Sequence, residues 1–234
     1  MSYLNWQNKT LENPTDADIE ALYNDGYVFT RVGKGYFTQT RSLRIDLSQF
    51  ELSSENRRIL KKAENIKLEI HPLPYENYHW SIHKLAKDFY TDKFGKDTFS
   101  ANKTKELLTN AEKSNFNTLL VYRTPVGARL LSCRSLAPTP TEPIGYCISL
   151  LTKNILHYSY PFYRQSKENP SIGLGMMTKA VCWAKEKDLK YIYLGSLQRP
   201  SDTYKLQFTG IEWFDGNVWQ TDLQPLKQIL KRCG

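Results

Sequence analysis

A strand–loop–helix–strand crossover in the second half of the chain constrains the fold more than any other feature of the sequence. Residues Ile155 to Tyr160 are typical of a strand, Ser171 to Lys187 of an amphipathic helix, and Tyr191 to Leu194 of a buried strand. The preceding strands, such as Thr118 to Tyr122 and Ile144 to Leu151, favour antiparallel pairing because no helix separates them. We therefore expect an α/β (α+β) chain with a central mixed, mostly antiparallel sheet.

A proline-marked linker at Pro72 and Pro74 predicts a soft domain boundary. We expect a small basic N-terminal module over residues 1–74 and a second, larger domain over 75–234. The 234 residues, 40% of them apolar, are enough for a proper core. No apolar stretch approaches the roughly 20 residues that a membrane-spanning helix needs, and the first twenty residues have no apolar region typical of a secretory signal. We therefore expect no membrane partner.

The charge of the chain favours polyanionic partners. Lys and Arg number 32 against 24 Asp and Glu, a formal net charge of +8. One predicted helix, Ser53 to Ile66, carries its cations on one side at helical spacing: Arg57, Arg58, Lys61 and Lys62. Its apolar residues lie on the other side, and Ser53 or Ser54 can cap its start. The cationic side is either a solvated helix face or a track for a phosphate backbone.

The junction that opens the predicted crossover helix is the best candidate for a phosphate site. It consists of Ser171, Ile172, Gly173, Leu174, Gly175 and Met176. The first amides of a helix are free donors at the positive end of its dipole, and glycines let a ligand approach the backbone closely. The alternative is that the glycines serve close packing of the helix against a strand.

The four cysteines are scattered, at Cys133, Cys147, Cys182 and Cys233. No pair has the spacing of a zinc ribbon or an iron–sulfur site. In a chain without an export signal, such cysteines are typical of reduced thiols, so we expect a cytoplasmic protein.

An ordered set of motifs resembles one family of transferases. In the N-terminal part, a short strand ending in Asp46 is followed by Phe50, then serines and the basic run from Arg57 to Lys62. The later motifs are Tyr158-Ser159-Tyr160-Pro161, Ser171-Ile172-Gly173, Trp183-Ala184-Lys185, Tyr191-Ile192-Tyr193-Leu194-Gly195 and Tyr204-Lys205-Leu206-Gln207-Phe208. Together they resemble the arginyl-tRNA–protein transferases and their bacterial leucyl-type homologues. The element order is also similar to the acyltransferase fold known as GNAT.

The resemblance implies an aminoacyltransferase that moves an arginine- or leucine-type amino acid from the 3′ end of a tRNA to a free amine, such as a protein N-terminus. Its partners would be tRNA and an acceptor protein or peptide. An aminoacyl ester is already activated, so a donor aimed at the developing oxyanion can do most of the work. We assign that role to Tyr204, and assign to Lys205 the binding of a carboxylate or phosphate. The alternative for this pair is an ordinary strand tyrosine and a surface lysine.

Three further residues are candidates for contact with the acceptor: Arg199, Asp202 and Tyr160. Arg199 and Asp202 lie in a predicted loop just after the Tyr191 to Leu194 strand, where ligands bind in open α/β sheets. A plain surface loop is the alternative for both.

One departure from the family bears on cofactors. Where these transferases carry a cysteine cluster, this chain has Thr38-Gln39-Thr40-Arg41-Ser42. We therefore expect no metal and no cofactor beyond aminoacyl-tRNA as co-substrate. Two other functions stay open: an N-acetyltransferase that uses acetyl-CoA, which Gly173 and Gly175 would suit, and a non-catalytic RNA-binding module.

Overall fold

The computed structural model describes residues 4–125, 141–165 and 170–232. Its elements are, in chain order, β1 (Gln7–Thr10), α1 (Asp16–Asn24), β2 (Tyr27–Phe29), β3 (Tyr36–Gln39), β4 (Ser42–Asp46), α2 (Ser54–Lys62), β5 (Lys67–Pro72), α3 (Trp80–Phe94), α4 (Ala101–Thr109), β6 (Thr118–Pro125), β7 (Thr141–Leu151), β8 (Ile155–Tyr163), α5 (Ile172–Glu186), β9 (Tyr191–Ser196), the 3-10 helix η1 (Pro200–Gln207), β10 (Ile211–Phe214), β11 (Trp219–Gln220) and α6 (Gln224–Arg232).

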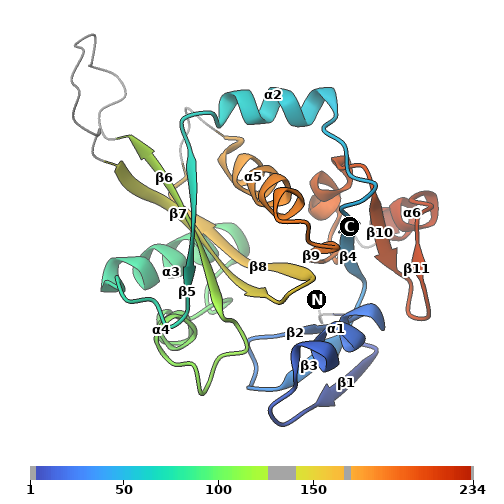
Figure 1. Ribbon diagram of the computed structural model, residues 1–234, viewed down its shortest axis with the longest axis horizontal. Helices are drawn as coiled ribbons and strands as arrows, with labels where there is room; N and C mark the ends of the chain where they lie inside the picture. Colours follow the sequence, from blue (N-terminus) through green and yellow to red (C-terminus); the bar gives the residue numbers. More distant parts are fainter. Residues whose placement is uncertain (1–3, 126–140, 166–169, 233–234) are drawn as a thin grey trace.

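An eight-stranded sheet forms the centre of the molecule (Figure 1), in the order β11-β10-β4-β9-β8-β7-β6-β5. Its neighbouring strands pair antiparallel except β8 and β9, which are parallel and are joined through α5. The prediction of an α/β chain with a mixed, mostly antiparallel sheet is confirmed, and the crossover that underlies the GNAT resemblance is present. Strands β4 and β5 belong to this sheet although they precede residue 74, while β1, β3 and β2 form a smaller sheet. The boundary near residue 74 stays a prediction.

Helices cover both faces of the large sheet, and the alternation along β6 shows which side is which. Leu120 and Tyr122 belong to the apolar cluster that includes α5 residues, whereas Leu119 and Val121 belong to the cluster that includes α3 and α4 residues. Successive side chains of a strand point to opposite faces, so a strand buried on both sides must be apolar throughout. Helices α2 and α5 therefore lie over one face, and α3 and α4 over the other (Figure 1).

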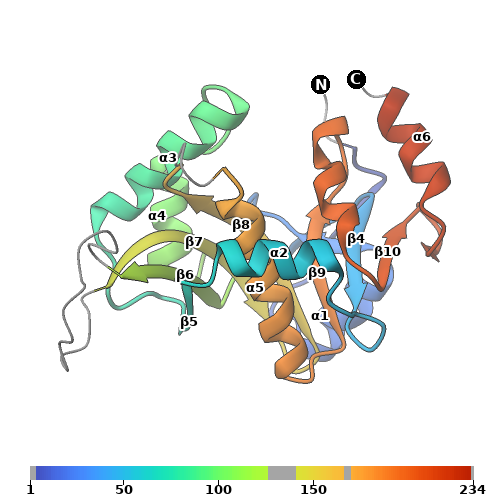
Figure 2. The same ribbon diagram turned by 90° about the horizontal axis from the view of Figure 1, so that it is seen from above.

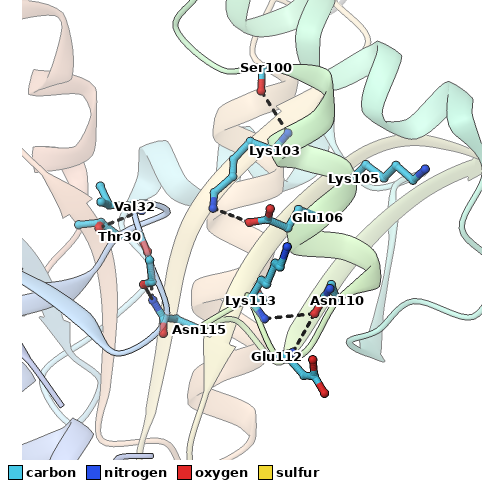
Figure 3. A network of polar contacts seen from close by, with 12 residues as sticks. Thr30, Val32, Ser100, Lys103, Lys105, Glu106, Asn110, Glu112, Lys113 and Asn115 are labelled. Carbon is cyan, nitrogen blue, oxygen red and sulfur yellow. Dashed lines mark hydrogen bonds and ion pairs between the residues drawn. The ribbon is translucent and has the colours of Figure 1, made fainter. Parts of the chain in front are cut away.

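The small sheet is fastened to the rest of the molecule by Asn115, which lies between α4 and β6 (Figure 3). Its Oδ1 accepts a hydrogen bond of 2.6 Å from the amide of Gly35, and its Nδ2 donates to the carbonyl oxygens of Gly33 at 2.6 Å and Thr30 at 3.2 Å. Lys34 in the same turn donates to the carbonyl oxygen of Ser114 at 2.7 Å. One buried amide thus satisfies three main-chain groups of the β2–β3 turn.

Replacing Asn115 with alanine should lower the free energy of unfolding by about 2–4 kcal/mol, because buried main-chain groups lose their partners at about 1–3 kcal/mol each, and part of that loss is recovered by solvent. Urea denaturation of the variant and of an Asn110→Ala control measures the difference. Asn110 is a half-buried cap whose side chain bonds only to adjacent amides. Equal stability of the two variants would contradict the role assigned to Asn115.

The sequence also predicts a final hairpin over residues 206–219 and a helix over residues 76–94, and both boundaries are wrong. The predicted loop before the hairpin is the 3-10 helix η1, and the hairpin is confined to β10 and β11. Pro200 at the first position favours a helical turn, and the Asp202 carboxylate accepts from the amides of Gln198 and Arg199, both at 3.0 Å. The helix α3 begins only at Trp80. Among the described helices, none has the length and apolar character to cross a membrane.

Candidate functional site

The parallel strands β8 and β9 separate partway along their length, and this opening is the centre of the candidate site. Their pairing runs from Ile155 opposite Tyr191 to His157 opposite Tyr193 and goes no further, although both strands continue. Gly195 in β9 has a φ of +76°, a conformation that suits glycine and turns the strand. Beyond this point β8 and β9 no longer pair with each other, and the strands diverge.

A β-bulge in β8 lies at the same place. Ser149 of β7 is opposite Tyr158 and Ile148 is opposite Tyr160, so Ser159 is the extra residue. The bulge reverses the alternation, which places Tyr158 on the α5 side and Tyr160 against the α3–α4 side. Among the described residues, the buried Ser159 hydroxyl has no hydrogen-bond partner, and the buried Tyr158 hydroxyl lies beside that of Tyr122. Bulges commonly redirect side chains at active sites, and nothing in the local sequence indicated this one.

The 3-10 helix η1 sorts its side chains into separate faces, since residues three apart eclipse each other in such a helix. Asp202 and Lys205 share the face toward the end of β9, where the Lys205 Nζ donates to the carbonyl oxygen of Ser196 at 3.0 Å. Tyr204 lies on a neighbouring face and is 41% exposed. The predicted pair Tyr204 and Lys205 thus lies on a helix, with Lys205 at the end of β9; the alternative of a strand tyrosine and a surface lysine is wrong.

Lys205 is buried, with 9% of its surface exposed. Burial lowers the pKa of its ammonium, and Lys93 lowers it further, while Asp202 opposes the shift. The Asp202 carboxylate is engaged by the amides of Gln198 and Arg199, and the hydrogen bond of Lys205 goes to a neutral carbonyl. A buried amine beside main-chain carbonyls is suited to stabilising negative charge that develops in the opening.

Tyr204 keeps its proton. Burial around its hydroxyl raises the pKa of Tyr204, and the charges of Asp202 and Tyr163 raise it further. A phenol that stays protonated at neutral pH can donate a hydrogen bond to an oxyanion, which is the role that the sequence suggested for it.

Tyr163 links the first turn of α5 to Lys93 of α3. A Cβ on Gly173 would be 2.4 Å from the Tyr163 hydroxyl oxygen, so glycine is what allows the tyrosine to cross the helix start. Lys93 of α3 donates to the same hydroxyl at 3.5 Å. Ser171 makes no side-chain cap, and the first intrahelical bond is from the Gly175 amide to the Ser171 carbonyl. The predicted phosphate site therefore has amide donors, a phenol and an ammonium close together; Lys93 was not anticipated, because only the fold brings α3 to α5.

The basic helix α2 packs directly against α5 (Figure 2). A Cβ on Gly175 would lie 2.8 Å from the Cβ of Ala63, so this glycine permits close contact between the helices. Ser53 caps α2 through the Asn56 amide at 3.1 Å, and Ile59 and Ala63 are buried against the core. The four predicted cations, Arg57, Arg58, Lys61 and Lys62, are all exposed, with Arg58 paired to Glu55 at 2.7 Å. Both junction glycines thus serve packing, and the cationic face belongs to a helix adjoining the phosphate candidate.

The candidates for acceptor contact are only partly brought together. Arg199 precedes η1, and its guanidinium carbon lies 5.0 Å from the ring centre of Phe94. Asp202 serves mainly to cap η1. Tyr160 packs against Phe99 and Phe116, both at ring distances of 5.3 Å, on the sheet face opposite α5. Arg199 and Asp202 therefore lie near Tyr204 in the chain, and Tyr160 packs among the aromatic side chains on the α3–α4 side.

His157, the last residue of the parallel pairing, makes the stability of the fold depend on pH. It is 3% exposed, its Nδ1 lies 2.7 Å from the Tyr23 hydroxyl, and burial lowers its pKa to about 3, with a further contribution from Lys205. The unfolded chain binds a proton at this histidine near pH 6.5, and the folded chain does not until about pH 3. The contribution to stability is therefore complete above pH 6.5 and is lost as the pH falls from 6.5 towards 3.

Lowering the pH from 7.5 to 5.0 should reduce the contribution of His157 to the free energy of unfolding by about 2 kcal/mol. The reduction is about 1.4 kcal/mol for each pH unit below 6.5. Urea denaturation of the natural chain and of His157→Asn at both pH values tests this. Carboxylates titrate alike in both proteins, so the natural chain should lose about 2 kcal/mol more than the variant. An equal loss of unfolding free energy in the two proteins would contradict the role assigned to His157.

Within the residues that the structure describes, no three His, Cys, Asp or Glu side chains are grouped so as to hold a metal ion. Cys147 is a buried thiol and Cys182 a half-buried one, neither in a disulfide; Cys133 and Cys233 lie outside the described residues. The expectation that no metal or cofactor is needed stays a prediction.

Comparison with known proteins agrees with the motif order. Residues 73–215, more than half of the chain, match the family described as "Arginine-tRNA-protein transferase, C terminus". Two relatives described as aspartate/glutamate leucyltransferase, from Dinoroseobacter shibae and Paracoccus denitrificans, are 27% and 25% identical over 193 and 194 residues. The alignments cover 78% and 76% of this chain and 63% of each relative, so the chain spans less than two thirds of their length.

Among solved structures the likenesses are weak. They include L-PGS from Bacillus licheniformis, with a TM-score of 0.47, 12% identity and coverage of 93% of this chain and 70% of the other. FemX gives a TM-score of 0.47 at 11% identity, over 92% of this chain and 70% of its own. The assignment rests on the sequence match over residues 73–215: the chain belongs to the arginine-tRNA-protein transferase family.

Proposed function

We propose that the chain transfers an amino acid from the 3′ end of a tRNA to the free amino terminus of a protein or peptide. The observation that carries this proposal is the position of Tyr204 and Lys205 on η1, at the end of β9 where β8 and β9 diverge, near the start of α5, where the Ser171 side chain makes no cap. The basic helix α2 adjoins α5 and offers four exposed cations for the tRNA backbone. The leucyltransferase relatives suggest leucine as the donor amino acid and an aspartate or glutamate N-terminus as the acceptor; arginine is the second donor to test, from the family description.

The reaction asks for positioning more than for strong acid–base catalysis. The acceptor nitrogen attacks the ester carbonyl carbon, the carbonyl oxygen gains negative charge, and the carbon–oxygen bond to the ribose then breaks. The proton lost by the amine ends on the released ribose hydroxyl. An α-amino group has a pKa of about 7.7–8.0, so roughly a tenth of it is neutral and nucleophilic at pH 7.

We assign each of these groups a role in the reaction. Tyr204 donates its hydroxyl proton in a hydrogen bond to the oxyanion, and a preorganised donor of this kind contributes roughly 3–4 kcal/mol to the transition state. Lys205 fixes the end of β9 by donating to the Ser196 carbonyl oxygen, and its positive charge favours the negative charge that develops on the oxyanion. The amides at the start of α5, with Lys93 and the Tyr163 hydroxyl, bind the phosphodiester that precedes the last nucleotide of the tRNA and so orient the ester.

The test is transfer of labelled leucine, and separately arginine, from charged tRNA to peptides that begin with Asp, Glu or Ala. We expect leucine to be transferred to the acidic N-termini and not to the Ala peptide. Absence of transfer from either tRNA to every peptide would refute the proposal. Calorimetry with acetyl-CoA covers the alternative: micromolar binding together with acetylation of a peptide amine would make the chain an N-acetyltransferase instead.

A further inference from the structure

An open hollow lies between η1 and α6, and the site described above does not use it. Its volume is about 640 Å³, within the range of about 300–1,000 Å³ that ligand pockets occupy. Helix α6 contributes two ammonium groups to the lining, Lys227 and Lys231, and none of the described residues that line the hollow carries a carboxylate. It also contains the apolar residues Leu206 and Leu230. Because α6 follows the family match at 73–215, this half of the hollow lies outside the region that the family description covers.

The two lysines are held in place by the fold of α6. Leu226 and Leu230 are 0% and 1% exposed and anchor the helix to the core. Lys227 and Lys231 are four residues apart, so they lie one above the other on the same face of the helix, and both are exposed. Their ammonium groups therefore present a paired positive charge along one wall of the hollow.

The hollow adjoins the reaction centre through η1. Because residues three apart eclipse each other in a 3-10 helix, Pro200, Thr203 and Leu206 face α6 and line the hollow, while Asp202 and Lys205 face β9. Tyr204 lies between these two faces. A chain whose amino terminus reacts beside Tyr204 needs to cross only this helix, a width of about 10 Å, which about three extended residues span.

We propose that this hollow binds an acidic segment of the acceptor polypeptide, at about the third to sixth residue after its amino terminus. The inference rests on the proposed function and deepens it by naming what the enzyme recognises beyond the first residue. Glutamate or aspartate side chains pair with Lys227 and Lys231, the glutamine amides of the lining donate to peptide carbonyls, and the half-buried Leu206 contacts the aliphatic parts of the peptide. A nucleic-acid backbone suits the cationic face of α2 instead, where four exposed cations follow one another along a helix.

The test compares two ten-residue peptides with the full chain and leucyl-tRNA. Both begin with Asp; one carries three Glu at positions 4–6 and the other three Gln. We expect equal kcat and a KM at least about tenfold lower for the Glu peptide, since charge pairs at a binding surface change affinity rather than chemistry. The double variant Lys227→Glu/Lys231→Glu should lose this preference, and Lys227→Gln/Lys231→Gln should reduce it.

A matched control is Lys87→Glu/Lys113→Glu, which makes the same change in net charge at exposed positions in α3 and after α4. It should keep the preference for the Glu peptide. Circular dichroism and the melting temperature show whether each variant is folded, and the Gln pair, which preserves the length and polarity of α6, decides the question if the Glu pair does not fold.

Three results would overturn the inference: equal KM for the two peptides, a preference that survives in the folded Lys227/Lys231 variants, or weakened tRNA binding in those variants with peptide KM unchanged. The last would identify RNA as the occupant. If neither peptide is a substrate with any charged tRNA, the proposed function fails, and fluorescence anisotropy of the labelled peptides without tRNA still decides the inference. Tighter binding of the Glu peptide that disappears in the double variant supports it, and equal binding contradicts it.

Discussion

Replacing Lys205 with methionine should reduce the rate of aminoacyl transfer by about 10²–10³-fold, the range measured when a preorganised electrostatic group is removed from an active site. Methionine has a similar length and fills the space of the buried stem, but it has no charge and cannot donate to the Ser196 carbonyl oxygen. The end of β9 then loses its tether at the place where the strands diverge, and the oxyanion loses nearby positive charge.

Single-turnover kinetics with excess charged tRNA measure this effect apart from binding. The fold should be retained at a cost of about 1–3 kcal/mol for the carbonyl left unpaired, which urea denaturation reports. The control is Lys187→Met, at an exposed lysine just after α5. Near-normal transfer by the folded Lys205→Met protein would remove Lys205 from the reaction centre and leave it a structural residue.

The second large effect concerns the cationic face of α2. Changing Arg57, Arg58, Lys61 and Lys62 together to glutamine should weaken tRNA binding by about 10²–10³-fold at moderate salt, because each phosphate contact releases a counterion. The slope of log K against log salt concentration should fall by up to about three, with Arg58 contributing least since Glu55 already engages it. Glutamine preserves the helix, because the residues that anchor α2 are Asn56, Ile59 and Ala63.

Filter binding or anisotropy over a range of salt concentrations measures both quantities. A fourfold control, Lys87, Lys96, Lys105 and Lys113 to glutamine, removes the same charge from exposed positions on the side of the sheet away from α2. An equal loss of affinity in the two proteins would mean that only net charge matters. An unchanged salt slope in the α2 variant would show that the tRNA backbone does not contact this helix.

The two predictions separate binding from chemistry. The α2 variant should transfer normally once tRNA is saturating, because its cations lie one helix away from the opening between β8 and β9. The Lys205 variant should bind tRNA normally and transfer slowly. A reversal of this pattern would exchange the roles assigned to α2 and η1.

The sequence by itself determined the elements that depend on neighbours in the chain. The apolar stripe, the serine cap and the four exposed cations of α2 follow from helical spacing, and the crossover from β8 through α5 to β9 follows from the lengths and polarity of three consecutive segments. These features rest on periodicity and capping, which act over a few residues. The candidates Tyr204 and Lys205 came instead from the resemblance of their motif to the transferase family, and their roles stay predictions.

Only the tertiary structure decided what surrounds those residues. The bulge at Ser159 depends on the register of β7 against β8, and the burial of Lys205 depends on where η1 meets β9. Lys93 reaches the start of α5 through Tyr163, across about 70 residues of chain, and Gly173 and Gly175 take their importance from Tyr163 and Ala63 rather than from a turn. Such contacts form when elements distant in the sequence pack together, and the residues near each contact in the sequence give no indication of its partner.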